Sequence, residues 1–164
     1  MGMLRAGQAT GDARFTEYVS IRFDFLGKAS PYFRAYKNAF PKETNPLEHF
    51  LFPQSLDDTG SMCAAITQSL RNGMVNDLRP EVNQSINFIM NKVYRIPDGT
   101  FARNRPMPNS VWVDDLYQGI PALAQMGKLT GGRKYFDEAT RQIVLFSEKL
   151  FDKTKGVCMH GMDG

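Results

Sequence analysis

The chain has 164 residues, of which 42% are hydrophobic and 23% are charged, and its formal net charge is +3. These proportions exclude a disordered or fibrous chain, and the length suffices for one domain with its own core. No apolar run approaches the roughly 20 residues of a membrane-spanning helix, so no membrane partner is expected. Residues 1–11 lack the apolar segment of a signal peptide, and a cytoplasmic and a periplasmic location both stay open.

No block of Lys or Arg accompanies the positive charge, so the composition argues against nucleic acid as a partner and suits a small acidic ligand. The two cysteines, Cys63 and Cys158, belong to no Cys-x-x-Cys pair. Two free thiols are the simplest interpretation, and a disulfide between them stays open at this point. With only His49 and His160 as further ligands, neither a metal site nor a cofactor is predicted.

The spacing of apolar residues predicts five helices, and the first three lie in the N-terminal half. The first helix spans about residues 13–26, with Asp12 as its N-cap and Gly27 directly after its end. The second spans residues 61–70. Pro80 is suited to the first position of the third helix, because proline there sacrifices no helical hydrogen bond.

The last two helices are predicted over residues 112–126, ending before Gly127, and over residues 133–151. Between the third and fourth helices, residues 95–110 are rich in Pro and Gly, and Asp98-Gly99 allows a short hairpin there. No run of alternating strands is visible, so the class is mainly α. The residues expected to face the core on the last helix are Tyr135, Ala139, Ile143, Phe146 and Leu150.

A short motif occurs twice at the same offset. Residues 10–15 (TGDARF) resemble residues 130–135 (TGGRKY), and Gly7 aligns with Gly127. The match predicts a repeated helical hairpin, and a turn used twice by coincidence is the alternative. Stacked hairpins bury their faces against their neighbours, so we expect a toroid or solenoid that this chain does not complete, truncated at both ends.

Two pairs of aspartates stand at predicted helix starts. Asp57 and Asp58 precede the second helix, and Asp114 and Asp115 begin the fourth. Carboxylates there commonly cap the helix, and Asp57 and Asp115 fit that role. Asp114 lies beside Trp112 in an apolar segment, so we expect it to be buried and to serve as a general acid. Asp58 is then a second carboxylate that tunes Asp114 or orients a water molecule.

Four further residues are candidates for binding. Trp112 offers a flat platform for a sugar ring, or is a large core residue. Arg103 and Arg105 precede the acidic helix and suit an anionic sugar, because a guanidinium binds a carboxylate with two parallel bonds; solvated loop charges are the alternative. His160 lies in a turn-rich tail, where a histidine more often faces solvent.

Taken together, these residues resemble the unsaturated rhamnogalacturonyl and glucuronyl hydrolases, glycoside hydrolase families 105 and 88. The resemblance runs from about Gly7 to the end. It implies an all-α (α/α)6 barrel of six helical hairpins, of which residues 1–164 would be one partial catalytic domain, roughly the first half. The segments that carry it are DGTF at 98–101, Arg103, Arg105-Pro106, SVWVDDLY at 110–117, QMGKLTG at 125–131, His160-Gly161, and LDDTGSM at 56–62.

The resemblance implies hydrolysis of unsaturated uronyl disaccharides derived from pectin or rhamnogalacturonan. Asp114 would protonate C4 of the vinyl ether and help water to reach C5, and the hemiketal would then rearrange and release the partner sugar. Asp58 falls on the supporting carboxylate and Trp112 on the stacking tryptophan. Arg103 falls where some relatives carry a histidine that contacts substrate, and His160 falls on the histidine of a His-Gly-Trp motif.

The chain departs from that last motif, because Met162 replaces its tryptophan. A non-catalytic helical toroid that binds sugar or protein is the alternative function, with Trp112 and the arginines used for recognition only. A sugar epimerase on a similar barrel fits poorly, because it needs histidines as both acid and base, and this chain has one well-placed histidine, His160. The specific disaccharide and the oligomeric state are not fixed by the sequence.

Overall fold

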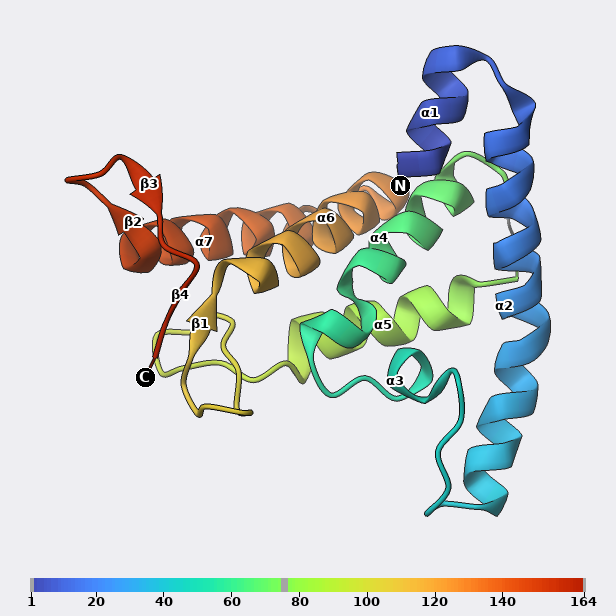
Figure 1. Ribbon diagram of the computed structural model, residues 1–164, viewed down its shortest axis with the longest axis horizontal. Coiled ribbons are helices and arrows are strands. Elements are labelled where there is room, and N and C mark those ends of the chain that lie inside the picture. The colour runs from blue at the N-terminus through green and yellow to red at the C-terminus, as the bar shows by residue number, and fades with distance from the viewer. Residues whose placement is uncertain (1, 75–76, 164) are drawn as a thin grey trace.

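The fold, described by a computed structural model over residues 2–74 and 77–163, is built almost entirely of helices (Figure 1). The prediction of an all-α class is confirmed. Strands within this described part are two residues long and form two antiparallel pairs, β1 with β4 and β2 with β3. The elements are α1 (Gly2–Thr10), α2 (Ala13–Ala39), α3 (Glu48–Leu51), α4 (Leu56–Arg71), α5 (Arg79–Asn91), β1 (Val111–Trp112), α6 (Val113–Thr130), α7 (Arg133–Leu150), β2 (Phe151–Asp152), β3 (Val157–Cys158) and β4 (Gly161–Met162).

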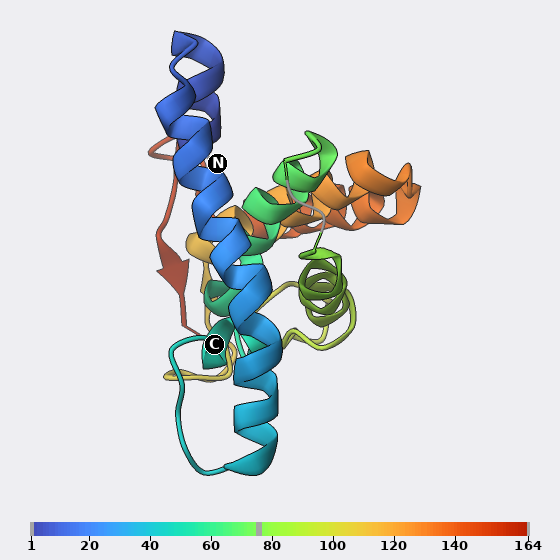
Figure 2. The ribbon, with the colours of Figure 1, turned by 90° about the vertical axis from the view of Figure 1, so that its right-hand side faces the viewer.

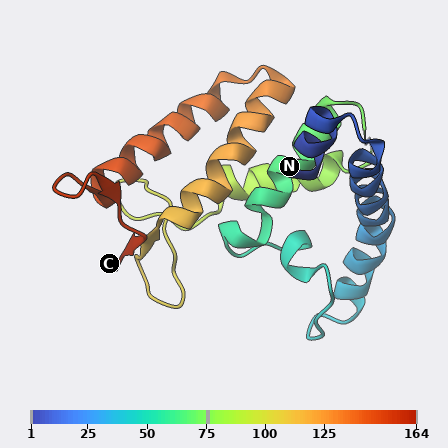
Figure 3. The same cartoon turned by 45° about the horizontal axis from the view of Figure 1, so that its top comes forward.

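Helices α4, α6 and α7 form the centre of the molecule. Figures 1 and 3 show α6 lying between α4 and α7, while the long helix α2 lies on the far side of α4 and α5 from α7. Figure 2 shows α2 in the foreground as a long rod with α1 at its upper end, and its Phe23 and Leu26 belong to the core. The approach of α4 to α6 requires Gly60, because a Cβ atom there would lie 2.6 Å from the backbone oxygen of Gln118.

The core is formed mainly by α4, α5, α6 and α7. Each contributes apolar side chains that are fully buried, and burying one such side chain stabilises the fold by about 1.5–3 kcal/mol. The buried face of α5 includes Val82, Ile86 and Ile89. Cys63 belongs to this core and Cys158 is exposed, so both are free thiols and the disulfide alternative is excluded.

The repeated motif forms the same turn at both places. The N–H of Gly11 donates to the oxygen of Gly7 at 2.9 Å, and the N–H of Gly131 donates to that of Gly127 at 2.8 Å. Both Gly11 and Gly131 have φ of 70°, a left-handed conformation that favours glycine. The predicted repeat is therefore confirmed for the turns α1–α2 and α6–α7, down to individual hydrogen bonds.

Three predicted helix boundaries are wrong. Gly27 does not end a helix, because α2 continues to Ala39 with Leu26 and Ser30 buried on one face. Gly127 lies inside α6, where the ring of Phe136 packs so closely that a Cβ atom would lie 2.6 Å from it. The second predicted helix begins at Leu56, five residues early, because a capping box formed by Ser55 and Asp58 starts it there.

Two further points differ from the sequence-based expectation. Helices α1 and α3 were not among the five predicted helices, because each is short, with nine and four residues. On α7, Ala139, Phe146 and Leu150 are buried as expected. Ile143 is 44% exposed, because Gln142 takes the buried position next to it.

The connection between α5 and β1 is anchored on α7. Residues Arg95 and Phe101 form an antiparallel bridge around the Asp98-Gly99 turn, which confirms the predicted short hairpin. The buried side chain of Gln142 accepts a hydrogen bond from the N–H of Phe101 and donates one to the oxygen of Gly99, both at 2.9 Å. This connection therefore has a fixed position from which it can present side chains to a site.

Within the described residues, no helix is both long enough and apolar enough to cross a membrane.

We expect Gln142→Leu to lower the free energy of unfolding by about 1–3 kcal/mol, because it leaves the buried N–H of Phe101 without its partner, while the oxygen of Gly99 keeps its bond from Arg95. Urea denaturation followed by circular dichroism measures the change. Gln8→Leu, at an exposed position of α1, is the matched control and should stay within about 0.5 kcal/mol of the parent. Equal stability of the two variants would show that the connection does not depend on Gln142.

The carboxylate of Asp98, in the turn between α5 and β1, is stabilised by a partly exposed ion pair. Its ion pair with Lys149 at 2.6 Å and its bonds from Thr100 hold the pKa of this carboxyl well below its usual range. The stabilisation is therefore complete above the unfolded pKa of about 4 and is lost as pH falls through the lower folded value. Because the side chain is 40% exposed, the contribution is about 1 kcal/mol or less.

We expect Asp98→Asn to destabilise the chain at neutral pH and to approach the parent in acid, as measured by denaturation at a series of pH values. Lys149→Met should behave similarly, because it removes the largest cause of the lowered pKa. Parallel pH curves for parent and Asp98→Asn would contradict this account.

Candidate functional site

The candidate residues gather where three chain segments meet at the start of α6. Figure 3 shows β1 leading into α6, with the C-terminal strand β4 beside β1 and the loop after α5 close by. Trp112 pairs with Gly161, and the N–H of Val113 donates to the oxygen of His160 at 2.8 Å. The pairing brings His160, 46 positions after Asp114 in the sequence, to the first turn of this helix.

The indole ring of Trp112 lies close to the guanidinium of Arg103 and to the imidazole of His160. The guanidinium carbon of Arg103 is 4.3 Å from the centre of the indole ring, and the His160 ring is 5.6 Å away with an interplanar angle of 46°. The side chain is partly exposed rather than a core residue. Gly161 is needed beside it, because a Cβ atom there would lie 2.9 Å from Cδ1 of Trp112.

Asp114 is in the first turn of α6, with one carboxylate oxygen 3.6 Å from Nδ1 of His160. Its side chain is 44% exposed, so the expectation that it is buried is wrong for this chain. Consecutive helical residues point about 100° apart, and Asp115 occupies the inward direction. What the structure does bring together is Asp114, His160 and Trp112, all on the open side of the helix start.

Asp115 is the buried carboxylate of this pair. Only 3% of its side chain is exposed, and burial raises its pKa, although the Arg103 guanidinium opposes that shift. Arg103 binds it with two parallel hydrogen bonds, each of 3.0 Å. The prediction that Asp115 serves as a simple helix cap is therefore wrong, because its oxygens accept from a side chain of another segment.

Arg103 also binds Asp57, with a nitrogen–oxygen distance of 2.8 Å. Burial lowers the pKa of the guanidinium, but its bonds to Asp115 and Asp57 outweigh burial and keep the pKa above its ordinary value. The sequence did not indicate this three-residue cluster. The available signal was the presence of two adjacent aspartates at each helix start, because successive helical residues point in different directions and can bind different partners.

Asp58 is used locally. Its Oδ2 accepts hydrogen bonds from the N–H groups of Gln54 and Ser55 at 2.8 and 2.9 Å, and its Oδ1 lies 3.5 Å from Nδ1 of His49. Among the described residues, no hydrogen bond or ion pair joins Asp58 to Asp114. Its role as a supporting carboxylate stays a prediction, and its observed role is to cap α4.

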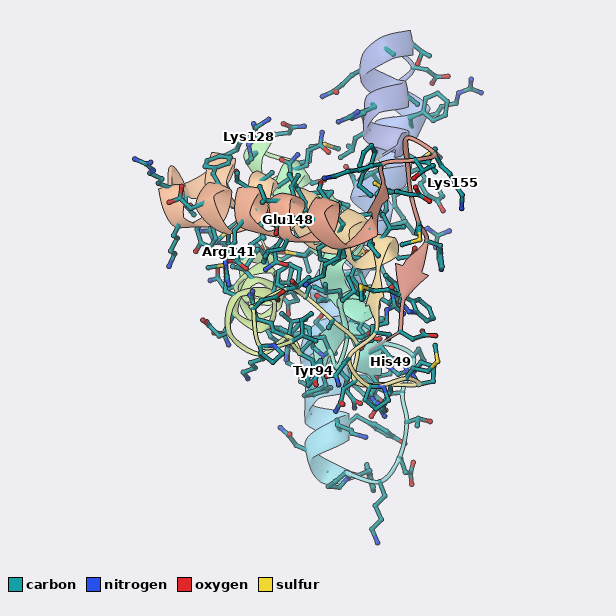
Figure 4. The ribbon with its side chains drawn as sticks, turned by 90° about the vertical axis from the view of Figure 1, so that its left-hand side faces the viewer. His49, Tyr94, Lys128, Arg141, Glu148 and Lys155 are labelled. Atoms are coloured by element: carbon teal, nitrogen blue, oxygen red, sulfur yellow. The ribbon has the colours of Figure 1, made fainter. Side chains whose placement is uncertain are left out.

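Arg105 is exposed and donates to the side chain of Gln54 at 2.5 Å. It borders a cavity of about 600 Å³ that is also lined by Tyr94, Arg103 and Asp115. In Figure 4, Tyr94 and His49 both lie in the lower half of the view, below α7. The cavity adjoins the cluster of Arg103 but does not include Trp112, Asp114 or His160 among its walls.

Within the part of the chain that the structure describes, no three His, Cys, Asp or Glu side chains are grouped closely enough to hold a metal ion. The groups that meet at the start of α6 are a carboxyl, an imidazole and an aromatic face. A carboxyl and an imidazole exchange protons, and an indole stacks on the apolar face of a sugar.

The sequence model of Glycosyl Hydrolase Family 88 matches residues 1–164. A similar solved structure is that of a possible member of the GH105 family from Salmonella enterica subsp. enterica serovar Paratyphi A, with a TM-score of 0.69 and 21% identity over 99% of this chain. Another is a possible GH105 family member from Klebsiella pneumoniae subsp. pneumoniae, with a TM-score of 0.68 and 19% identity over 99% of this chain.

This chain spans 38% of the length of each of these two proteins. At this level of identity the likeness establishes the fold, which is an all-α part of a larger helical toroid. No curated protein matches the sequence.

We expect Gly161→Ala to displace the indole ring of Trp112, because the added Cβ would lie 2.9 Å from it. Trp112 is the single tryptophan of the chain, so its fluorescence emission and its quenching by acrylamide report the change directly. Gly2→Ala is the matched control, because no atom lies within 4 Å of a Cβ there. Identical spectra for parent and Gly161→Ala would refute the close packing of β4 on Trp112.

Proposed function

The chain belongs to glycosyl hydrolase family 88, and on this premise we propose that the protein hydrolyses unsaturated uronyl disaccharides derived from pectin or rhamnogalacturonan. The reaction would be hydration of the C4–C5 double bond, with Asp114 as general acid and base. The observation that carries the proposal is the grouping of Asp114, His160 and Trp112 at the start of α6.

The proposed reaction uses one carboxyl twice. Protonated Asp114 gives its proton to C4 of the vinyl ether, and a water molecule adds to C5 while its proton returns to the carboxylate. The product is a hemiketal, which opens and releases the partner sugar. Water is the one reagent consumed, so no second carboxylate at the anomeric carbon is needed, unlike the paired-carboxylate scheme of most glycosidases.

His160 and Trp112 support this scheme. The imidazole nitrogen 3.6 Å from Asp114 is placed to donate to the carboxylate after its proton has left. A sugar ring stacked on the partly exposed indole would cover Asp114 and shield it from bulk water, apart from the one water molecule that reacts. An exposed carboxyl of the free protein can thus become an enclosed one when substrate is bound.

Arg105 is the better candidate of the two arginines for the uronate carboxylate. Its side chain is exposed, and its one bond among the described residues is to Gln54. The nitrogens of Arg103 are instead directed at Asp57 and Asp115. The positive net charge of +3 is compatible with an anionic substrate.

We expect Asp114→Asn to lower kcat by about 100-fold or more, because the amide cannot supply the proton. The assay follows the ultraviolet absorbance of the conjugated double bond in an unsaturated rhamnogalacturonan disaccharide. Asp137→Asn, on the exposed face of α7, is the matched control and should keep the activity of the parent. Full turnover by Asp114→Asn would refute the assignment.

A non-catalytic sugar-binding role is the second candidate, favoured by the 44% exposure of the Asp114 side chain. In that case the disaccharide would change the fluorescence of Trp112 without any loss of absorbance at the double bond. Turnover would exclude this role, and the absence of both signals would exclude both candidates for this substrate.

A further inference from the structure

Arg103 connects three parts of the candidate site that are distant in sequence. Its side chain bridges Asp57 in the first turn of α4 and Asp115 in the first turn of α6, with distances of 2.8 and 3.0 Å. Arg103 itself belongs to the connection between α5 and β1, which is anchored on α7. One guanidinium thus links the starts of two helices to a fixed loop.

Every nitrogen of this guanidinium is bound to a carboxylate. Nε donates to Asp115, Nη1 lies 2.8 Å from Asp57, and Nη2 donates to Asp115 at 3.0 Å and to Asp57 at 3.2 Å. The side chain is 13% exposed. A guanidinium so occupied lacks a free pair of donors for a substrate carboxylate, which needs two parallel N–H groups.

Both the main chain and the side chain of Arg103 fix the position of Trp112. The N–H of Arg103 donates to the oxygen of Ser110 at 2.8 Å, two residues before the tryptophan. The guanidinium carbon lies 4.3 Å from the centre of the indole ring, a distance suited to a cation–π contact. Arg103 therefore holds the indole ring through its guanidinium, and it holds the segment that leads into β1 through its main-chain N–H.

Asp115 transmits the constraint to the preceding residue, Asp114. It directly follows Asp114 in the first turn of α6, and its bonds to Arg103 fix the rotation of that turn about the helix axis. The outward direction of Asp114, toward His160, follows from the inward direction of Asp115.

We propose that Arg103, Asp57 and Asp115 form a positioning cluster that sets the orientation of Trp112 and of Asp114 without touching substrate. The cluster would act on the rate of the proton transfer, since small misplacements of reacting groups are costly. This inference rests on the proposed function for its effect on catalysis, but its effect on Trp112 is independent of any activity.

The first test needs no substrate. We expect Arg103→Gln and Asp115→Asn to change the emission maximum and near-ultraviolet circular dichroism of Trp112, while far-ultraviolet circular dichroism keeps the helical content of the parent. Arg133→Gln, whose side chain is 90% exposed on α7, is the matched control and should leave the spectra unchanged. Unaltered Trp112 spectra in both cluster variants would overturn the proposal.

Arg103→Lys is a more conservative variant, which keeps the test decisive if Arg103→Gln or Asp115→Asn fails to fold. Lysine keeps the positive charge but has a single ammonium group, which cannot form parallel bonds to two carboxylates. We expect it to fold and yet to show an altered Trp112 signal. Parent-like spectra in Arg103→Lys would show that charge alone is required, and the positioning role would be refuted.

The second test separates positioning from substrate binding. On the unsaturated disaccharide, a positioning role predicts that Arg103→Lys lowers kcat by about 10- to 100-fold with KM within about threefold of the parent. A raised KM with unchanged kcat would instead show that Arg103 binds substrate directly, and would overturn the proposal. If the parent has no turnover, the proposed function fails, and the spectra alone decide whether the cluster positions Trp112.

Discussion

The close contact between α4 and α6 is the constraint on which the site depends. It requires Gly60, since any side chain there would collide with the backbone of Gln118, and the side chain of Gln118 in turn accepts from the N–H of Ser61 at 2.8 Å. Because the two helices are held this closely, a single guanidinium can bind an aspartate from each of their first turns. A looser packing of the helices would leave Arg103 with one partner.

The two aspartate pairs show how neighbouring identical residues acquire different roles. In the first turn of α6, Asp115 is buried against Arg103 while Asp114 faces the open side with His160. In the first turn of α4, Asp57 binds Arg103 while Asp58 accepts from the backbone of residues 54 and 55. The difference arises because successive residues of a helix point about 100° apart. Burial against Arg103 then fixes one carboxylate of the α6 pair, while the other stays partly exposed beside His160.

The chain belongs to glycosyl hydrolase family 88, and its fold is similar to that of helical proteins described as possible GH105 members. The chain spans 38% of the length of those two proteins, so its activity is a proposal for the protein. Within the chain, the parts that carry the proposal are anchored: β1 pairs with β4, and the loop after α5 is fixed by Gln142.

The sequence by itself determined the all-α class, the repeated glycine turn and the proximity of Trp112 to Asp114, because apolar periodicity, left-handed glycines and chain neighbours are local properties. It did not determine that α2 and α6 pass through Gly27 and Gly127, since packing on these helices decides whether a glycine ends them. Nor could it tell that Asp115, and not Asp114, is the buried aspartate of its pair, or that His160 lies beside Asp114. Those outcomes depend on the positions of Arg103 and β4, which only the tertiary structure fixes, because they are contacts between segments far apart in the chain.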